Sequence, residues 1–223
     1  MGELTSKTCR GTLAAICVGG VSEMLLESRI IQTGWYKSPL VGSVRITPSG
    51  IPGDTQVNTK THGGPDRAVC FYSKDNYVYW ERILGRALPT TAAFGENFTV
   101  AGLLEPDVCV GDVLAIGNAL LQVTQPRNPC HKIPARYSRP QMAIEMLSSG
   151  RTGFFCRVLS EGDVEAGESF YLEHRALGAP SIAEVNRVIF DRSDVGGAQR
   201  VLAIEGIADA LVARLAARLS LLR

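Results

Sequence analysis

Short apolar runs separated by turn residues dominate the chain from Leu13 to about Glu173. They occupy residues 13–18, 98–100, 107–117, 120–125 and 154–159. Gly117-Asn118 lies between two of these runs and is a suitable hairpin turn, because both residues tolerate positive φ; residues 160–163 are predicted to form another. Many short strands at this spacing indicate a closed or nearly closed barrel. The fold class that we expect is therefore mainly β with helices, an α+β arrangement.

Two helices are predicted to interrupt the strands. In the first, Ser73 can cap the N-terminus, Tyr77 and Trp80 share an apolar face, and Gly85 can end the helix. The second is predicted over residues 138–150, where methionines and a leucine form the buried stripe. Both are expected to be packing elements.

The pattern changes after residues 178–180, where helix signals replace strand signals. Ser181 and Glu184 have the spacing of a capping box, and two more helices are predicted near 194–204 and 207–221. This divides the chain into a barrel domain, 1–177, and a three-helix domain, 178–223. So small a helical unit should dock on the barrel or on a partner, and we expect it to lie outside the catalytic core. It could close a homodimer, or Arg214 and Arg218 could dock an acidic electron donor; the alternative for these two arginines is a solvated helix face, which is the more common case.

The charges are almost balanced, with 23 lysines and arginines against 22 acids. A net charge of +1 provides no global field for nucleic acid or an anionic membrane, so any anion site must be local. The start of the chain lacks a basic stretch followed by a long apolar run, and no segment reaches the ~18 uninterrupted apolar residues of a membrane span. We expect a cytoplasmic protein that binds neither nucleic acid nor a membrane.

Most of the six cysteines have the sequence context of core residues. They include no C-x-x-C pair, which argues against a structural zinc site and a disulfide framework in a chain without an export signal. Four lie within apolar or alternating runs and are predicted to be small buried hydrophobes: Cys17, Cys70, Cys109 and Cys156.

Cys130 has different surroundings. It follows a strand in a loop broken by Pro126 and Pro129 and flanked by three basic side chains, Arg127, His131 and Lys132. Positive charge favours the thiolate, which is both a nucleophile and a soft metal ligand. The alternative is a simple exposed thiol.

Two further clusters of turn residues could carry chemistry. Around residues 60–70 the paired glycines can form an anion nest, and Arg67 offers a planar donor fork; a plain turn with a surface arginine is the alternative. Residues 93–100 place Gly95, Glu96 and Asn97 directly before a strand, where they could present donors to a ligand, although most such sequences are only turns.

The order of these motifs resembles the MOSC family, named after the C-terminal domain of molybdenum-cofactor sulfurases. The motifs are THGGPDRAVC at 61–70, AFGENFTV at 93–100, VGD at 110–112 and QVTQPRNPCHK at 122–132. The resemblance extends from about Leu13 through Glu173, and the helical tail resembles the extension of the YiiM-like branch.

The resemblance implies a β-barrel that holds the molybdopterin form of the molybdenum cofactor, with Cys130 as the protein ligand to the metal. The implied activity is reduction of small N-hydroxylated compounds: hydroxylaminopurines and other N-hydroxylated bases, amidoximes or N-oxides. The residues carried over to the cofactor pocket are His62, Gly63, Gly64, Arg67, Gly95, Glu96, Asn97, Arg127 and Asn128, with Arg157 as a further candidate for the pterin phosphate. One departure is Gly19-Gly20, where a Gly-Lys pair is expected; Lys37 or Lys60 could substitute.

Reduction of N–OH to N–H requires a two-electron centre, which no side chain supplies, so a cofactor is needed. The chain has no G-x-G-x-x-G after a strand and no cysteine set for an iron–sulfur cluster. Electrons should therefore come from a separate reductase or a flavodoxin- or ferredoxin-type protein. Two other interpretations remain: a metal-free thiol enzyme with Cys130 as nucleophile and His62 or His131 as base, and a noncatalytic carrier of molybdenum cofactor or sulfur.

Overall fold

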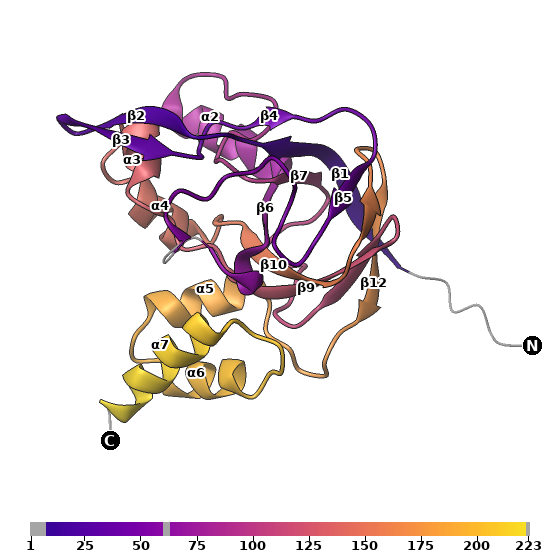
Figure 1. Cartoon of the computed structure of the whole chain (residues 1–223). Helices are drawn as coiled ribbons and strands as arrows, with labels where there is room; N and C mark the ends of the chain where they lie inside the picture. Colours follow the sequence, from indigo (N-terminus) through magenta and orange to yellow (C-terminus); the bar gives the residue numbers. More distant parts are fainter. Residues whose placement is uncertain (1–7, 60–62, 222–223) are drawn as a thin grey trace, which may run out of the picture.

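The fold is built around a closed seven-stranded barrel (Figure 1). The computed structural model describes residues 8–59 and 63–221. Around the ring the strands are β1 (Cys9–Val18), β7 (Phe98–Ala101), β6 (Val69–Ser73), β10 (Phe154–Ser160), β9 (Ala119–Pro126), β8 (Val113–Ile116) and β12 (Ser169–His174), which pairs with β1 again. The β6–β7 pair is parallel and the other pairs of the ring are antiparallel. The predicted barrel is confirmed.

Short strands decorate the barrel. Strand β4 (Ser38–Pro39) extends the sheet beside β1, and β5 (Val44–Ile46) pairs with β11 (Gly162–Val164). Strands β2 (Ser22–Leu26) and β3 (Arg29–Thr33) form a hairpin that projects from the body of the molecule in Figure 1.

Helices cover one side and one end of the barrel. The 3₁₀ turns η1 (Pro65–Arg67) and η2 (Lys74–Asn76) flank β6, and the helices are α2 (Tyr77–Leu84), α3 (Lys132–Tyr137), α4 (Met142–Ser149), α5 (Ile182–Phe190), α6 (Val195–Leu202) and α7 (Asp209–Ser220). No helix in the described ranges is long and apolar enough to cross a membrane.

Aromatic rings fill the barrel. Phe71 lies 4.9–5.6 Å, between ring centroids, from Phe98, Phe154 and Phe170, and all four side chains are at most 1% exposed. Each such ring contributes about 1.5–3 kcal/mol through burial alone. Because the interior is packed in this way, a ligand has to bind beside the barrel and not within it.

The C-terminal helices share the core of the barrel. Ile182, Val185, Val201 and Leu211 belong to the same buried cluster as the barrel strands. The Ala208 N–H, just before α7, donates to the Thr124 carbonyl of β9 (3.0 Å). The tail therefore docks on the barrel, one of the two arrangements that we expected. The predicted capping box of Ser181 and Glu184 is present at the start of α5.

Several predicted boundaries are wrong, and turns explain why. Only Val113–Ile116 of the run 107–117 is a strand, because the Cys109 N–H donates to Asp112 Oδ2 (2.8 Å) and closes a turn. The turn at Gly117-Asn118 is a β8–β9 hairpin as predicted. Residues 160–163 do not form a hairpin, since β11 leaves β10 and pairs with β5.

The first two predicted helices also differ in detail. Ser73 caps η2, through the Asp75 N–H, and α2 follows to end at Gly85, which has φ 65°. The helix predicted over 138–150 is α4, which begins only at Met142, because Ser138 adopts the left-handed conformation (φ 50°) and Pro140 follows. Helix α3, which was not predicted, positions the loop that carries Cys130.

Candidate functional site

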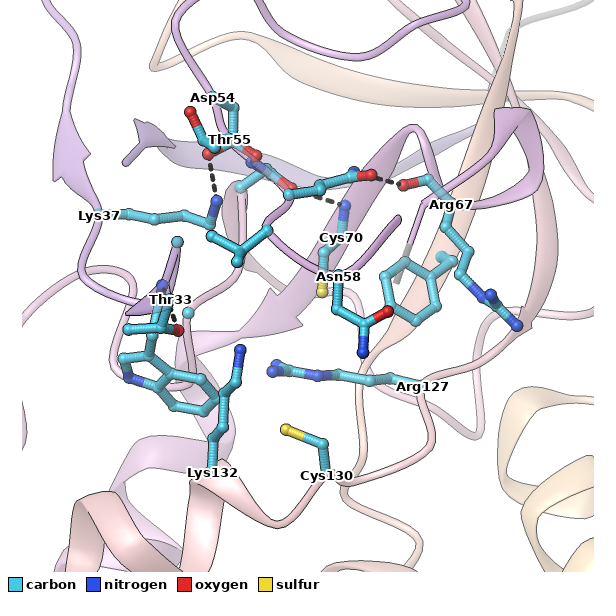
Figure 2. A pocket seen from close by; sticks show the side chains of 17 residues that line it. Thr33, Lys37, Asp54, Thr55, Asn58, Arg67, Cys70, Arg127, Cys130 and Lys132 are labelled. Carbon is cyan, nitrogen blue, oxygen red and sulfur yellow. Dashed lines mark hydrogen bonds and ion pairs between the residues drawn. The ribbon is translucent and has the colours of Figure 1, made fainter. Parts of the chain in front are cut away.

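A pocket with an empty volume of about 620 Å³ lies beside the barrel wall. Its lining comes from segments 33–37 and 54–58, from the start of β6 and from the loop that follows β9. Figure 2 shows Cys70, Arg127 and Cys130 in its centre, with Lys37 and Asp54 at one end and Arg67 at the other. The barrel wall thus provides the floor and the loops provide the functional side chains.

The loop after β9 places Cys130 and Arg127 in the pocket. The Arg127 N–H donates to the Gly153 carbonyl (3.0 Å), which holds the start of the loop on the barrel. The Cys130 carbonyl accepts from the Ile133 N–H (3.0 Å), which begins the turn that leads into α3. The Cys130 side chain is partly exposed. Both ends of this proline-broken loop are anchored, so the thiol is held facing the pocket.

Arg127 is a buried cation directed into the pocket. It is 8% exposed, and its Nη1 has no hydrogen-bond partner among the described residues. Its guanidinium lies 5.5 Å from the ring centroid of Trp35. Burial on its own lowers the pKa of Arg127, but the thiols of Cys70 and Cys130 and the Glu96 carboxylate more than offset it, so the net shift is upward. Arg127 is therefore a charged donor with an unused N–H, which suits an anionic ligand.

Cys70 was predicted to be a core residue, and the structure shows that this was only half right. It is 7% exposed, yet it lines the pocket, and in Figure 2 its sulfur and that of Cys130 approach Arg127 from opposite sides. Burial raises the pKa of the Cys70 thiol to about 11, against a smaller opposing effect of Arg127. Cys17, Cys109 and Cys156 are buried as predicted.

One end of the pocket is formed by the ion pair of Lys37 with Asp54. The Gly19 N–H donates to the same carboxylate (2.9 Å). The Gly19-Gly20 pair, which stands where a Gly-Lys pair was expected, therefore lies against this ion pair. A Cβ at Gly19 would lie 2.4 Å from the Tyr36 carbonyl oxygen, which explains the glycine. Lys37 lines the pocket but is paired with Asp54, and Lys60 lies outside the described residues.

The residues of the second motif have different surroundings. Gly95 and Asn97 line the pocket, but the Asn97 amide already bonds to the Cys70 N–H, the Cys17 carbonyl and Asp54 Oδ2. A Cβ at Gly95 would meet Trp35 at 3.1 Å. These residues shape the pocket wall more than they offer free donors to a ligand.

Glu96 does not line the pocket, although it was predicted to bind the cofactor. It is fully buried and accepts from the Phe94 N–H (2.9 Å), Thr99 Oγ1 (3.0 Å) and the Tyr77 hydroxyl. Burial raises the pKa of its carboxyl group. Its hydrogen bonds therefore stabilise the turn at residues 94–99 and join it to Tyr77 of α2.

The first motif is brought to the pocket only in part. Arg67 lines it, Gly63 and Gly64 are not among its lining residues, and His62 lies outside the described residues. Gly64 has φ 96° and precedes η1, so its glycine serves the turn.

The last two predicted residues lie elsewhere. Asn128 is exposed and lines a neighbouring pocket. Arg157 lines neither pocket, because Asp66 Oδ1 binds its guanidinium at 2.7 Å and Gln122 and the Ile207 carbonyl are also close. Its observed contacts join the barrel to the C-terminal helices.

Sequence reasoning missed Trp35, Asp54 and Cys70 as pocket residues and treated Lys132 only as a nearby charge. Lys132 was detectable, since it is the second residue after Cys130. Cys70 ends the motif at 61–70, but its apolar strand context indicated a core position. Trp35 and Asp54 come from segments far from Cys130 in the chain.

The described residues contain no group of three or more His, Cys, Asp or Glu side chains able to hold a metal ion. A metal bound by Cys130 would have to bring most of its ligands with it, as an ion chelated by an organic cofactor does. The Cys130 sulfur is a soft metal ligand, and the Nη1 of Arg127 has no partner among the described residues. Together they fit a group that contains both a chelated metal and a negatively charged substituent. A bare ion fits the described residues poorly.

Comparisons with known proteins agree with the motif order. The family model described as "MOSC domain" matches residues 58–171. The chain is 37% identical to "Uncharacterized protein YflK" of Bacillus subtilis (strain 168), over 86% of this chain and 87% of that protein. It is similar to the crystal structure of YiiM from Geobacillus stearothermophilus, with a TM-score of 0.79 and 32% identity over 94% of this chain and 99% of the other. A protein named "Reductase" in Gibberella moniliformis (strain M3125 / FGSC 7600) is 32% identical over a region that covers 82% of this chain and 33% of that longer protein.

Proposed function

The chain belongs to the MOSC domain family, and from this premise we propose that it is a molybdenum-cofactor-dependent reductase of small N-hydroxylated compounds. Cys130 is the proposed protein ligand to molybdenum and the catalytic residue. The observation that carries the proposal is the pairing of a partly exposed thiol, Cys130, with a buried and incompletely bonded guanidinium, Arg127, in one pocket. The reductase-named relative supports the reaction type.

The residues of this chain have separate tasks in the proposal. Arg127 and Lys132 would hold the anionic part of the cofactor, because both line the pocket beside Cys130 (Figure 2). Trp35 would keep the Arg127 fork in place from behind. Bound in this way, the cofactor supplies the two-electron centre that side chains lack.

The reaction consumes two electrons and two protons. The N–O bond breaks, the nitrogen takes one proton to form N–H, and the OH group takes the other and leaves as water. The electrons come from a separate reductase or a flavodoxin- or ferredoxin-type protein. Lys132, which lines the same pocket as Cys130, is the proposed proton donor there.

Metal analysis and turnover test this proposal together. Gently purified protein should contain molybdenum and a fluorescent pterin, and should reduce a hydroxylaminopurine when an artificial donor such as reduced methyl viologen supplies electrons. Molybdenum and pterin without turnover would support a carrier instead. Activity that needs no metal but is blocked by thiol alkylation would support the thiol enzyme.

Cys130→Ser and Cys70→Ser form a matched pair of variants, since both thiols line the same pocket. Cys130→Ser replaces a soft ligand by a harder and far less acidic one, so turnover should be abolished and the sulfur contribution to the molybdenum X-ray absorption spectrum should decrease. Cys70→Ser should keep both, at a cost of about 1–3 kcal/mol in the free energy of unfolding, because it places a hydroxyl at a buried position. A Cys130→Ser protein with full turnover and an unaltered molybdenum spectrum would refute the proposed ligand.

A further inference from the structure

A second pocket, also with an empty volume of about 620 Å³, lies between the loop after β9 and the C-terminal helices. Its lining combines Pro126 at the end of β9 and Asn128 of that loop with Leu147 of α4, Ile189 of α5 and Leu211 of α7. Neither the barrel nor the helices could form this pocket alone. It adjoins the first pocket, because Arg67 and Arg127 line both.

The polar lining of the second pocket is cationic. No Asp or Glu occurs among the described residues that line it. The polar side chains are three arginines and three amides: Arg67, Arg127, Arg214, Gln125, Asn128 and Asn186. In Figure 2 the Arg67 side chain points away from Cys130, and Arg67 also lines the second pocket. The chain as a whole has a net charge of only +1, so this concentration of positive charge is local.

Two side chains in this pocket could bind a polar ligand. Arg214 is an exposed cation, and partial burial followed by repulsion from Arg192 and Arg218 lowers its pKa. Asn186 is 1% exposed; its Nδ2 donates to the Gly150 carbonyl (3.1 Å) and to Thr152 Oγ1 (2.8 Å), while its Oδ1 has no partner among the described residues. An anion would pair with the Arg214 guanidinium, and a hydroxyl or N–H donor would satisfy the Asn186 oxygen.

The remaining lining is aliphatic and suits the uncharged part of a ligand. Pro126, Leu147, Ile189 and Leu211 give the pocket an apolar wall. A ligand with an anionic end and a hydroxylated ring whose carbon atoms can lie on the apolar wall would match the arginines, the Asn186 oxygen and this wall. The sugar phosphate of a nucleoside monophosphate has these parts.

We infer that the second pocket binds the 5′-phosphate and ribose of a nucleotide substrate, so that the base reaches Cys130 across the shared Arg67 and Arg127. This inference rests on the proposed function, which it narrows to N-hydroxylated nucleotides. The cofactor's anionic part is assigned to Arg127 and Lys132 beside Cys130, so Arg214, which lines only the second pocket, serves a different anion. The C-terminal helices are then part of the substrate site, because α7 supplies Arg214.

Arg214→Gln and Arg200→Gln are the variants for the test. Both remove one positive charge from the helical extension, but Arg200 is exposed on α6 and lines neither pocket. Binding of adenosine 5′-monophosphate and of adenosine is measured by calorimetry on the purified full-length protein, which needs no turnover. The Michaelis constants of the N-hydroxylated nucleotide and of its free base are then compared, together with the molybdenum and pterin content.

The expected result is that the unsubstituted protein binds the monophosphate more tightly than adenosine. Arg214→Gln should weaken monophosphate binding by about tenfold, leaving adenosine binding and cofactor content unchanged, and Arg200→Gln should change none of them. Equal binding of monophosphate and adenosine, or equal monophosphate affinity in both variants, would overturn the inference. Loss of pterin from Arg214→Gln would also overturn it, by assigning these arginines to the cofactor. A selective loss of monophosphate binding in a protein without reductase turnover would leave the site standing while the proposed reaction failed.

Discussion

Replacing Arg127 with methionine distinguishes a ligand-binding arginine from a structural one. Removing one partner of a buried ion pair typically lowers the free energy of unfolding by about 3–5 kcal/mol. The Nη1 of Arg127, however, has no partner among the described residues, so removing it relieves about 1–3 kcal/mol of unmet hydrogen bonding. Losing the contact with Trp35 costs about 0.5–2 kcal/mol. The two effects nearly cancel, and the free energy of unfolding of the cofactor-free protein should change by about 1 kcal/mol or less.

The effect on the cofactor should be much larger. A charge-assisted hydrogen bond to an anion contributes about 1.5–3 kcal/mol, so cofactor affinity should fall by about 10- to 150-fold. The assay pairs calorimetric unfolding of the cofactor-free protein, where 1 kcal/mol corresponds to roughly 2–4 °C in Tm, with molybdenum and pterin content after purification. Arg136→Met is the control, because Arg136 lies over the Tyr36 ring at 5.7 Å but does not line the pocket.

The reasoning would be refuted if Arg127→Met lost 3 kcal/mol or more of stability in the cofactor-free state and retained its molybdenum. That result would make Arg127 a structural residue whose partners lie within the protein.

Two other predictions concern the fold around the site. Ser181→Ala removes the N-terminal cap of α5, which belongs to the common core, and should lower the free energy of unfolding by about 1 kcal/mol; an unchanged Tm would show that the cap does not stabilise the fold. Burial raises the pKa of Glu96 above its ordinary value near 4.5, so the folded protein holds a proton at pH values where the unfolded chain has released it. The stability of the unsubstituted protein relative to Glu96→Gln should therefore decrease as the pH rises from about 4.5 through the raised pKa. Urea unfolding of both proteins at pH 5 and pH 8 measures this, and a difference that does not depend on pH would contradict it.

The sequence by itself determined the features that depend on neighbouring residues. The strand at residues 120–125, the hairpin at Gly117-Asn118 and the capping box at Ser181 each depend on a few adjacent side chains and backbone groups, and each was predicted. Cys130 also stood out locally, because prolines and basic residues surround it in the chain.

Only the tertiary structure decided which side chains share a pocket. Cys70 and Glu96 both occur in motif segments, yet β6 directs Cys70 into the pocket while Glu96 is buried behind it. Arg157 was expected at the cofactor but binds Asp66, 91 residues away in the chain, and the second pocket exists only where α7 meets the loop after β9. Burial and charge pairing depend on contacts between segments far apart in sequence, and a local pattern contains no information about which distant group will arrive.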